Sequence, residues 1–457
     1  MIFCLYKKYK NNFYYPAFWI ILKKSIKKQN NFKRSIYTKA MIMINGGQRL
    51  EGEVIISGSK NATLAIIAAA CLCDSAIELH NVPLIEDIFD MREILYSMGC
   101  RTHIDAHGVM VIEPNTLNSC FATHPKMHSI RAASYFMGAL IGRFKMGCVS
   151  MPGGCKIGSR PINYHLDGFE ALGVKCTMVE DKIFLNSKGE LSGGDITLPY
   201  PSVGTTVNLM IAAVRARGKT VIKNAATEPN VIDAANFLVS VGADIKGVGT
   251  PTITINGVAR LVQTVPYTVS PDHIEAGTFL IYCGICGGDL ILKNARADDL
   301  NKVIEVLKDM GAIIISKNNI IKISVDRRLK ASHITTGPHP EFPTDLQQLM
   351  LSLMAVSDGV STITETVFEN RFRQAEELNL MGAKINIQAN TAVIEGVEKL
   401  EPSKLAASDL RGGAALIGAA LNARGVSVIS GDNYISRGYQ DIVGKLSSVN
   451  AVIDYYG

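Results

Sequence analysis

The chain has 457 residues, which at roughly 100–200 residues per domain predicts two to four domains. Hydrophobic residues make up 47% and charged residues 19%, a composition that supports large cores and excludes a wholly disordered protein. Residues 1–42 hold ten of the 47 Lys and Arg and no Asp or Glu, which leaves 37 basic and 41 acidic residues in the remainder. The remainder is mildly acidic despite the overall charge of +6, so we expect no nucleic-acid partner.

Residues 1–42 differ in composition from the rest of the chain. Their apolar run Phe13–Leu22 is ten residues long, half of what a membrane span needs. We interpret 1–42 as a disordered tail or an over-long gene start, with an interfacial anchor or a transit peptide as alternatives. No other run reaches about 18 apolar residues, so we expect no stable membrane insertion.

The ten cysteines show no framework spacing. Cys283 and Cys286 lie in the apolar run Thr278–Cys286, where a buried helix is a better interpretation than a redox or zinc pair. These features predict a cytoplasmic, thiol-reduced protein without a metal.

An internal repeat organises the chain. A helix-like stretch that ends in a glycine or asparagine recurs at successive spacings of 74, 69, 69, 71 and 68 residues. These markers are typical of left-handed helix C-caps, and alternating strand-like runs follow them. Six units of about 70 residues most economically make two domains of three units, without the regular rhythm of a doubly wound sheet. The markers are Gly99, Gly173, Gly242, Gly311, Gly382 and Asn450.

The segment Ser57–Ile67 places Lys60 and Asn61 at the start of a helix-like run, after a Gly58–Ser59 turn. Lysine beside the free amides of a helix N-terminus suits a phosphate or a carboxylate. Ordinary helix capping with an exposed lysine is the alternative.

The segment Met151–Asn163 combines three glycines, Cys155, Lys156 and Arg160, and predicts a mobile loop. Neighbouring cations favour the thiolate of Cys155, which indicates a reactive thiol rather than a small core residue.

Three arginines occupy strand-to-helix turns in the later repeats, and a fourth has a corresponding place earlier in the chain. A single arginine at such a turn is usually an exposed residue without a specific role. Together with Lys60 and Arg160, however, these arginines indicate a site where several cations bind one polyanionic small molecule. Ser202 and Asp345 each precede a helical pattern, for which helix N-capping is the simplest interpretation. The arginines are Arg131, Arg371, Arg411 and Arg437.

At these motifs the chain resembles the enolpyruvyl transferases, and within them the branch that acts on UDP-N-acetylglucosamine. The resemblance runs from about Met43 to the C-terminus and includes SGSKNA, PGGCKIGSRP, PSVGTT, EPNVIDAANFL, PDHIEAGTF, FPTDLQ, TETVFENRF, DLRGGAAL and RGYQD in order. It implies an α/β fold of two inside-out α/β barrel domains, each with three βαβαββ units, joined by a double crossover. Residues 60–270 would form the domain with the cysteine loop, and 43–59 with 271–457 the other.

The resemblance also implies the reaction. Phosphoenolpyruvate would donate its enolpyruvyl group to the 3-hydroxyl of UDP-N-acetylglucosamine and release phosphate, without a cofactor. Cys155 matches the general acid, which also forms a covalent thioketal adduct with the donor, and Asp345 matches the base. Lys60 and Arg437 complete the expected catalytic set.

The remaining matches are to binding positions. Those around phosphoenolpyruvate are Lys60, Asn61, Arg131, Arg160, Arg371, Arg411 and Arg437. Those around UDP-N-acetylglucosamine are Asn61, Arg131, Arg160, Pro161, Ile162, Asn163, Tyr164, Tyr200, Pro201, Ser202, Val203, Glu228, Asp345 and Val367.

Two departures from the family pattern concern affinity rather than catalysis. His273 stands where the family often has arginine, and Asn163 where it often has aspartate. The nearest rival, the shikimate-pathway relative on the same fold, lacks the Gly-Gly-Cys loop. A redundant paralogue has the same activity and cannot be separated by sequence. A non-catalytic sugar-nucleotide sensor is disfavoured by the intact Cys155, Lys60, Asp345 and Arg437.

Overall fold

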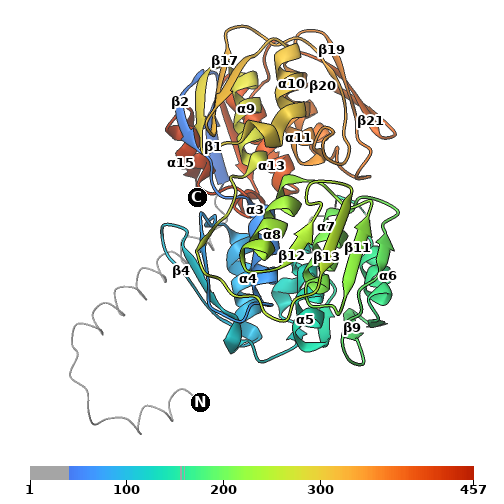
Figure 1. The fold of residues 1–457 in the computed structure, drawn as a ribbon. Helices are drawn as coiled ribbons and strands as arrows, with labels where there is room; N and C mark the ends of the chain where they lie inside the picture. The colour runs from blue at the N-terminus through green and yellow to red at the C-terminus, as the bar shows by residue number, and fades with distance from the viewer. Residues whose placement is uncertain (1–40, 155–156, 159, 457) are drawn as a thin grey trace, which may run out of the picture.

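The computed structural model describes residues 41–154, 157–158 and 160–456. Figure 1 shows two lobes, with the chain passing from the upper lobe to the lower one and back again. Each lobe contains three four-stranded sheets with one arrangement, in which a parallel pair of strands is extended by two antiparallel strands. The sixfold repeat predicted from the sequence is therefore confirmed, as is the predicted α/β class.

Each unit runs strand, helix, strand, helix, strand, strand. In the lower lobe the elements are β14 (Tyr267–Thr268), α3 (Lys60–Ala70), β3 (Ile77–His80), α4 (Glu86–Ser97), β4 (Arg101–Ile104) and β5 (Met110–Glu113); β6 (Phe121–Ala122), α5 (Phe136–Phe144), β7 (Met146–Ser150), α6 (Asn163–Ala171), β8 (Lys175–Val179) and β9 (Lys182–Asn186); and β10 (Asp195–Thr197), α7 (Val203–Ala213), β11 (Lys219–Lys223), α8 (Pro229–Ser240), β12 (Asp244–Lys246) and β13 (Thr252–Asn256).

The upper lobe repeats this order. Its elements are β2 (Leu50–Ile55), α9 (His273–Cys286), β15 (Gly288–Lys293), α10 (Asn301–Asp309), β16 (Ile313–Lys317) and β17 (Ile320–Val325); β18 (His333–Thr335), α11 (Thr344–Ala355), β19 (Val360–Thr364), α12 (Gln374–Leu380), β20 (Lys384–Gln388) and β21 (Thr391–Glu395); and β22 (Lys404–Ala406), α13 (Leu410–Asn422), β23 (Val426–Ser430), α14 (Asp432–Ile435), α15 (Ile442–Ser447), β24 (Val452–Tyr456) and β1 (Met41–Asn45). Short 3₁₀ turns lie at Pro114–Thr116, Pro125–His128, Arg131–Tyr135 and Ala297–Leu300.

The first helix of each unit lies inside its lobe, while the sheets and the second helices, such as α10 with four of its nine residues buried, lie toward the outside. Every residue of α13 is buried, and ten of the eleven residues of α3 are buried. The strands, by contrast, bury alternate residues, as β11 and β21 do. A helix that is apolar on all sides must be surrounded, whereas an antiparallel sheet can leave one face in water. This distribution is the inside-out arrangement expected from the sequence.

The repeat markers have the conformation that the sequence predicts. Each marker follows the last helix of its unit, and the five glycine markers have a positive φ, from 83° at Gly173 to 113° at Gly311. Asn450 takes the same conformation with φ 73°. Glycine adopts this left-handed backbone conformation at the lowest cost, and asparagine adopts it more readily than most other residues. The markers therefore end their helices as C-caps do.

Two crossovers connect the lobes. β2 pairs in parallel with β15 in the upper lobe, yet the chain continues from β2 into α3 of the lower lobe. β14 pairs in parallel with β3 in the lower lobe, and the chain continues from it into α9 of the upper lobe. β1 inserts between β23 and β24 and completes the sixth sheet. The buried apolar side chains accordingly form two clusters, one drawn from 62–269 and the other from 42–56 together with 274–453.

The expected tail is two residues too long. Met41 and Ile42 belong to β1, and the side chain of Ile42 is 1% exposed in the upper core. Met41 and Ile42 are therefore part of the upper lobe; residues 1–40, including the run Phe13–Leu22, lie outside the described residues. Within the described ranges, no helix combines the length and the apolar character that crossing a bilayer requires. Cys283 and Cys286 both lie in α9, as predicted.

Candidate functional site

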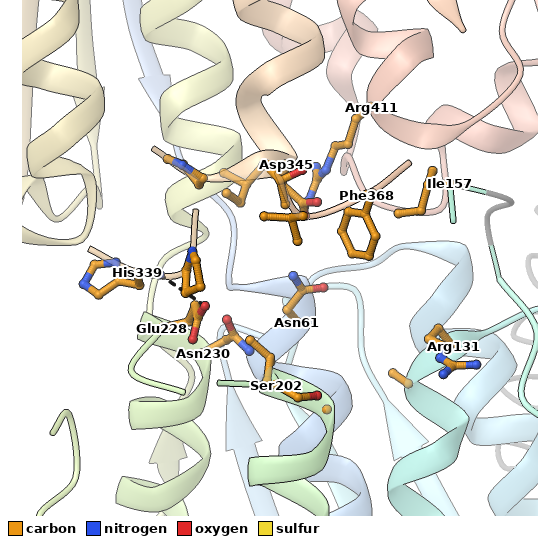
Figure 2. Close-up of a pocket in the computed structure, with 18 of the residues that line it drawn as sticks. Asn61, Arg131, Ile157, Ser202, Glu228, Asn230, His339, Asp345, Phe368 and Arg411 are labelled. Carbon is orange, nitrogen blue, oxygen red and sulfur yellow. Dashed lines mark hydrogen bonds and ion pairs between the residues drawn. The ribbon is translucent and has the colours of Figure 1, made fainter. Parts of the chain in front are cut away.

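A cavity of about 680 Å³ lies where the two lobes meet. Figure 2 shows Asn61, Ser202, Glu228 and Asn230 projecting from elements of the lower lobe. Asp345, Phe368, Arg411 and His339 approach the same space from the upper lobe. The lining includes five arginines, Arg131, Arg160, Arg371, Arg411 and Arg437, together with Lys60 and Lys302.

The first turn of α3 brings Lys60 and Asn61 to the cavity wall. Ser59 caps this helix through its side chain, which accepts from the amide of Ala62, as the turn at Gly58–Ser59 predicts. The ammonium group of Lys60 lies 2.8 Å from the carboxylate of Asp87, in the first turn of α4.

Asp87 also binds a cation from the other lobe. Nε of Arg437 donates to it at 2.8 Å, and Nη2 of Arg437 donates to the carbonyl of Ser129 at 2.8 Å. Burial raises the pKa of the Asp87 carboxyl, but Lys60 and Arg437 outweigh this effect and hold the pKa below its ordinary value. Asp87 is therefore a buried carboxylate that joins one cation of each lobe.

Asp345 forms a second charged centre on the upper wall. Its carboxylate pairs with Arg371 and, at 3.2 Å, with Arg411; both guanidinium groups are buried. Burial raises the pKa of Asp345, but Arg411 and Arg371 lower it far more, so the group is ionised at neutral pH. Nη1 of Arg411 is buried and has no hydrogen-bond partner among the described residues. A buried guanidinium with an unsatisfied donor is suited to receive an anion.

Helix capping explains Ser202 but does not explain Asp345. The side chain of Ser202 accepts from the amide of Thr205 and caps α7, as predicted. The N-cap of α11 is Pro343, and Asp345 makes no capping bond because its carboxylate is turned toward the two arginines. The capping interpretation of Asp345 was wrong, and its pairing with buried cations gives it a different role.

The cysteine-containing segment reaches across the cavity. Its described residues up to Ile162 form neither helix nor strand, as expected for a loop, and α6 begins at Asn163. The carbonyl of Ile157 accepts from the amide of Asn370 in the upper lobe at 3.0 Å. Arg131 donates to the carbonyl of Arg160, and burial together with the charge of Arg160 lowers the pKa of Arg131 to about 10. Cys155, the expected general acid, lies outside the described residues, as do Lys156 and Ser159.

The opposite end of the cavity carries polar groups without partners. Glu228, the N-cap residue of α8, accepts from the amide of His339 at 3.3 Å, a contact dashed in Figure 2. Its Oε2 and the Nδ2 of Asn230 are buried without a hydrogen-bond partner among the described residues. Burial raises the pKa of Glu228. Thr227 donates to the carbonyl of His339 at 2.9 Å, so this end is closed by direct contacts between the lobes.

The structure brings most of the expected residues together. Those that line the cavity are Lys60, Asn61, Arg131, Arg160, Pro161, Tyr164, Tyr200, Pro201, Ser202, Val203, Glu228, Asp345, Val367, Arg371, Arg411 and Arg437. Ile162 and Asn163 are not among the lining residues: Ile162 packs into the lower core, and Asn163 is exposed at the start of α6. His273, one of the departures, does line the cavity, and burial lowers its pKa.

Sequence reasoning did not identify several lining residues. Asp87 stands in the first turn of α4, where the helix dipole favours an acid, but nothing in the sequence pairs it with Lys60 and Arg437. His165 lines the cavity but bonds Asn208 through Nδ1 at 2.9 Å, and burial lowers its pKa to about 3, so it is a neutral structural group. Asn230 lies in the motif EPNVIDAANFL, but only Glu228 of that motif was taken as a site residue, and His339 was not singled out either.

Comparison with known proteins identifies the family. Residues 44–446 match the family model for EPSP synthase (3-phosphoshikimate 1-carboxyvinyltransferase). The chain is 43% identical to UDP-N-acetylglucosamine 1-carboxyvinyltransferase 3 from Caldanaerobacter subterraneus over 90% of this chain and 98% of that protein. It is 42% identical, with the same coverage, to UDP-N-acetylglucosamine 1-carboxyvinyltransferase from Enterobacter cloacae.

Solved structures agree on the fold. The enolpyruvyl transferase NikO from Streptomyces tendae superposes with a TM-score of 0.82 at 23% identity, over 91% of this chain and 98% of that one. An EPSP synthase from Acinetobacter baumannii gives 0.72 at 18% identity, over 92% of this chain and all of that one. The chain has this fold and a cation-lined cavity between the lobes, and its relatives are more than 40% identical over nine tenths of its length. It therefore belongs to the enolpyruvyl transferases, in the family of the UDP-N-acetylglucosamine 1-carboxyvinyltransferases.

Proposed function

We propose that this enzyme transfers the enolpyruvyl group of phosphoenolpyruvate to the 3-hydroxyl of UDP-N-acetylglucosamine and releases phosphate, the first committed step of peptidoglycan synthesis. The observation that carries the proposal is the cavity itself, in which Lys60 and Arg437 flank one carboxylate and Arg371 and Arg411 flank another. A donor with a phosphate and a carboxylate needs two such cationic centres.

The cations would bind the donor and stabilise the charge that develops during transfer. Nη1 of Arg411 has an unsatisfied buried donor for this purpose, and Arg131, Arg160 and Asn61 line the same cavity. Protein contacts hold several of these groups close to the cavity before the donor binds, which lowers the entropic cost of assembling the site. No cofactor takes part in this chemistry.

Proton transfers would be divided between two groups. Cys155 would protonate the methylene carbon of the donor, the sugar oxygen would add to the adjacent carbon, and Asp345 would accept the hydroxyl proton. Loss of a methyl proton and of phosphate from the tetrahedral intermediate then gives the enol ether. The anionic donor would compete for Arg371 and Arg411 and thereby raise the pKa of Asp345 toward its ordinary value, which makes it a better base. Cys155 would also form the covalent thioketal adduct with the donor.

The sugar nucleotide would occupy the other end of the cavity. Glu228 Oε2 and Asn230 Nδ2, a buried acceptor and a buried donor, offer the paired contacts that an amide-like base edge requires. Tyr200, Ser202 and Val203 line the wall beside them. The protein would work in the cytoplasm on these two small molecules, with no nucleic-acid partner, and its domains would be 60–270 and 43–59 with 271–457.

A phosphate-release assay tests the proposal. Phosphate should appear only when phosphoenolpyruvate and UDP-N-acetylglucosamine are both present, and one product should form with the mass of the enolpyruvyl ether. Release with shikimate 3-phosphate as the acceptor would instead identify the shikimate-pathway activity. Binding of the sugar nucleotide without turnover would indicate a sensor.

A further inference from the structure

Asp272 occupies an unusual position between the two lobes. It ends the second crossover and is 5% exposed. Its Oδ1 accepts from the amides of Ile274 and Glu275 at 2.9 and 3.0 Å, which caps α9 of the upper lobe. Its Oδ2 accepts from the amide of Lys60 at 2.9 Å, at the first residue of α3 in the lower lobe. A single carboxylate thus serves the N-termini of two helices that belong to different lobes.

The two crossovers support this arrangement by bonding to each other. The amide of Ser59 donates to the carbonyl of Ser270 at 2.8 Å, and the amide of Asp272 donates to the carbonyl of Ser57 at 2.8 Å. Gly58 and Pro271 form an antiparallel bridge between the same segments. The start of α3 is therefore fixed against the start of α9 by contacts within one small, buried region.

The charge of Asp272 has a physical reason. Each helix N-terminus carries about half a positive charge and several amides without an intrahelical acceptor. The two N-termini repel each other where they meet, and a carboxylate between them removes the repulsion and satisfies three donors. The amide of Lys60 donates to Asp272, and the side chain of Ser59, which caps the same helix, accepts from the amide of Ala62. Ser59 therefore does not replace Asp272 as the acceptor for Lys60.

We propose that Asp272 is a positioning residue for the transfer reaction. It holds the first turn of α3, and with it Lys60 and Asn61, in register with the upper lobe that carries Asp345 and Arg411. Asp272 has no role in binding substrate here; it acts through the backbone of Lys60. The inference rests on the proposed function, since Lys60 matters only if the cavity binds and activates a donor.

The variant Asp272→Ser separates capping from positioning. A serine at an N-cap still accepts from the helix it begins, so α9 keeps its cap. Its single, shorter hydroxyl cannot at the same time reach the amide of Lys60. The matched control is Asp441→Ser, which changes another N-cap aspartate, whose side chain accepts from Gly444 at the start of α15. Asp272→Asn is a second variant, in which one amide group keeps the size of the side chain but loses one of its two acceptors.

For Asp272→Ser we expect kcat to fall about 10–100-fold, as a displacement of the order of 1 Å at a reacting group costs. The KM values for both substrates should stay within threefold. The melting temperature should fall further than that of Asp441→Ser, because the buried amide of Lys60 loses its acceptor whereas Asp441 is exposed. Hydrogen exchange should accelerate in peptides from the start of α3 while peptides from α9 keep their protection. Asp441→Ser should keep the kcat of the unmodified enzyme.

The inference is overturned if Asp272→Ser keeps kcat within threefold, or if α9 loses its protection while α3 does not. If Asp272→Ser does not fold, the same measurements on Asp272→Asn decide between these outcomes. An unmodified enzyme that releases no phosphate from the two substrates would contradict the proposed function itself. An active unmodified enzyme with an unaffected Asp272→Ser variant would contradict the positioning role alone.

Discussion

Replacing Asp345 by asparagine should destabilise the substrate-free enzyme more than replacing any surface carboxylate. The change leaves Arg371 and Arg411 buried without the negative charge that pairs with both. Breaking a buried pair by removing one partner costs about 3–5 kcal/mol. The side chain of Asp345 is 29% exposed, and Arg371 keeps its bond to the carbonyl of Thr344 at 3.2 Å. We therefore expect a loss of about 2–3 kcal/mol in the free energy of unfolding, or about 4–12 °C in melting temperature.

The pH dependence of this loss has a definite sign. The pKa of Asp345 is lowered in the folded protein, so its stabilisation is fully present above the unfolded pKa of about 3.9. It disappears as the pH falls through the still lower folded pKa. The difference in unfolding free energy between the unmodified enzyme and Asp345→Asn should be constant from about pH 5 to 8 and should shrink below about pH 4.

Phosphate provides an independent readout. In Asp345→Asn the two guanidinium groups lack a counter-charge, so inorganic phosphate should stabilise this variant more than the unmodified enzyme. Denaturant unfolding at several phosphate concentrations measures both effects. Asp358→Asn is the control, because Asp358 forms an exposed pair with Arg328 at 3.8 Å and should change little. Equal stability of Asp345→Asn and the unmodified enzyme, with equal responses to phosphate, would refute the reasoning.

Three further outcomes are expected. A chain beginning at Met41 should match the full chain in stability and turnover. A chain beginning at Met43 lacks the buried Ile42, so its free energy of unfolding by denaturant should be about 1–3 kcal/mol lower. Equal stability of the two truncated chains would contradict the role of β1. Thr227→Val removes a 2.9 Å bond between the lobes and should raise the KM for UDP-N-acetylglucosamine about 3–10-fold in steady-state kinetics, and an unchanged KM would show that the bond is not retained during turnover. Fosfomycin should form one adduct, which peptide mass mapping should place at Cys155. Cys155→Asp should be active and resistant to fosfomycin, whereas Cys155→Ser should be nearly inactive. Inactivation through an adduct on another cysteine would exclude Cys155 as the general acid.

The sequence determined the architecture to the extent that local chemistry dictates it. The spacing of the markers from Gly99 to Asn450 predicted six units, because a left-handed C-cap is set by the residue that occupies it. Ser59 and Ser202 predicted two helix starts, since an N-cap bond spans only two or three residues. The motifs also predicted the family, and most of the residues taken from them line one cavity.

Only the tertiary structure decided which residues from distant segments come together. Asp87 binds Arg437 across 350 positions of sequence, and Asp272 joins Lys60 to α9 across 212 positions. Asp345 looked like a helix cap until Arg371 and Arg411 were placed beside it. Such pairings depend on how two crossovers orient two lobes, and no periodicity or cap within one segment encodes that orientation. The charged residues in the sequence therefore indicate which side chains are candidates for the site, while the packing of the two lobes determines which of them pair with one another.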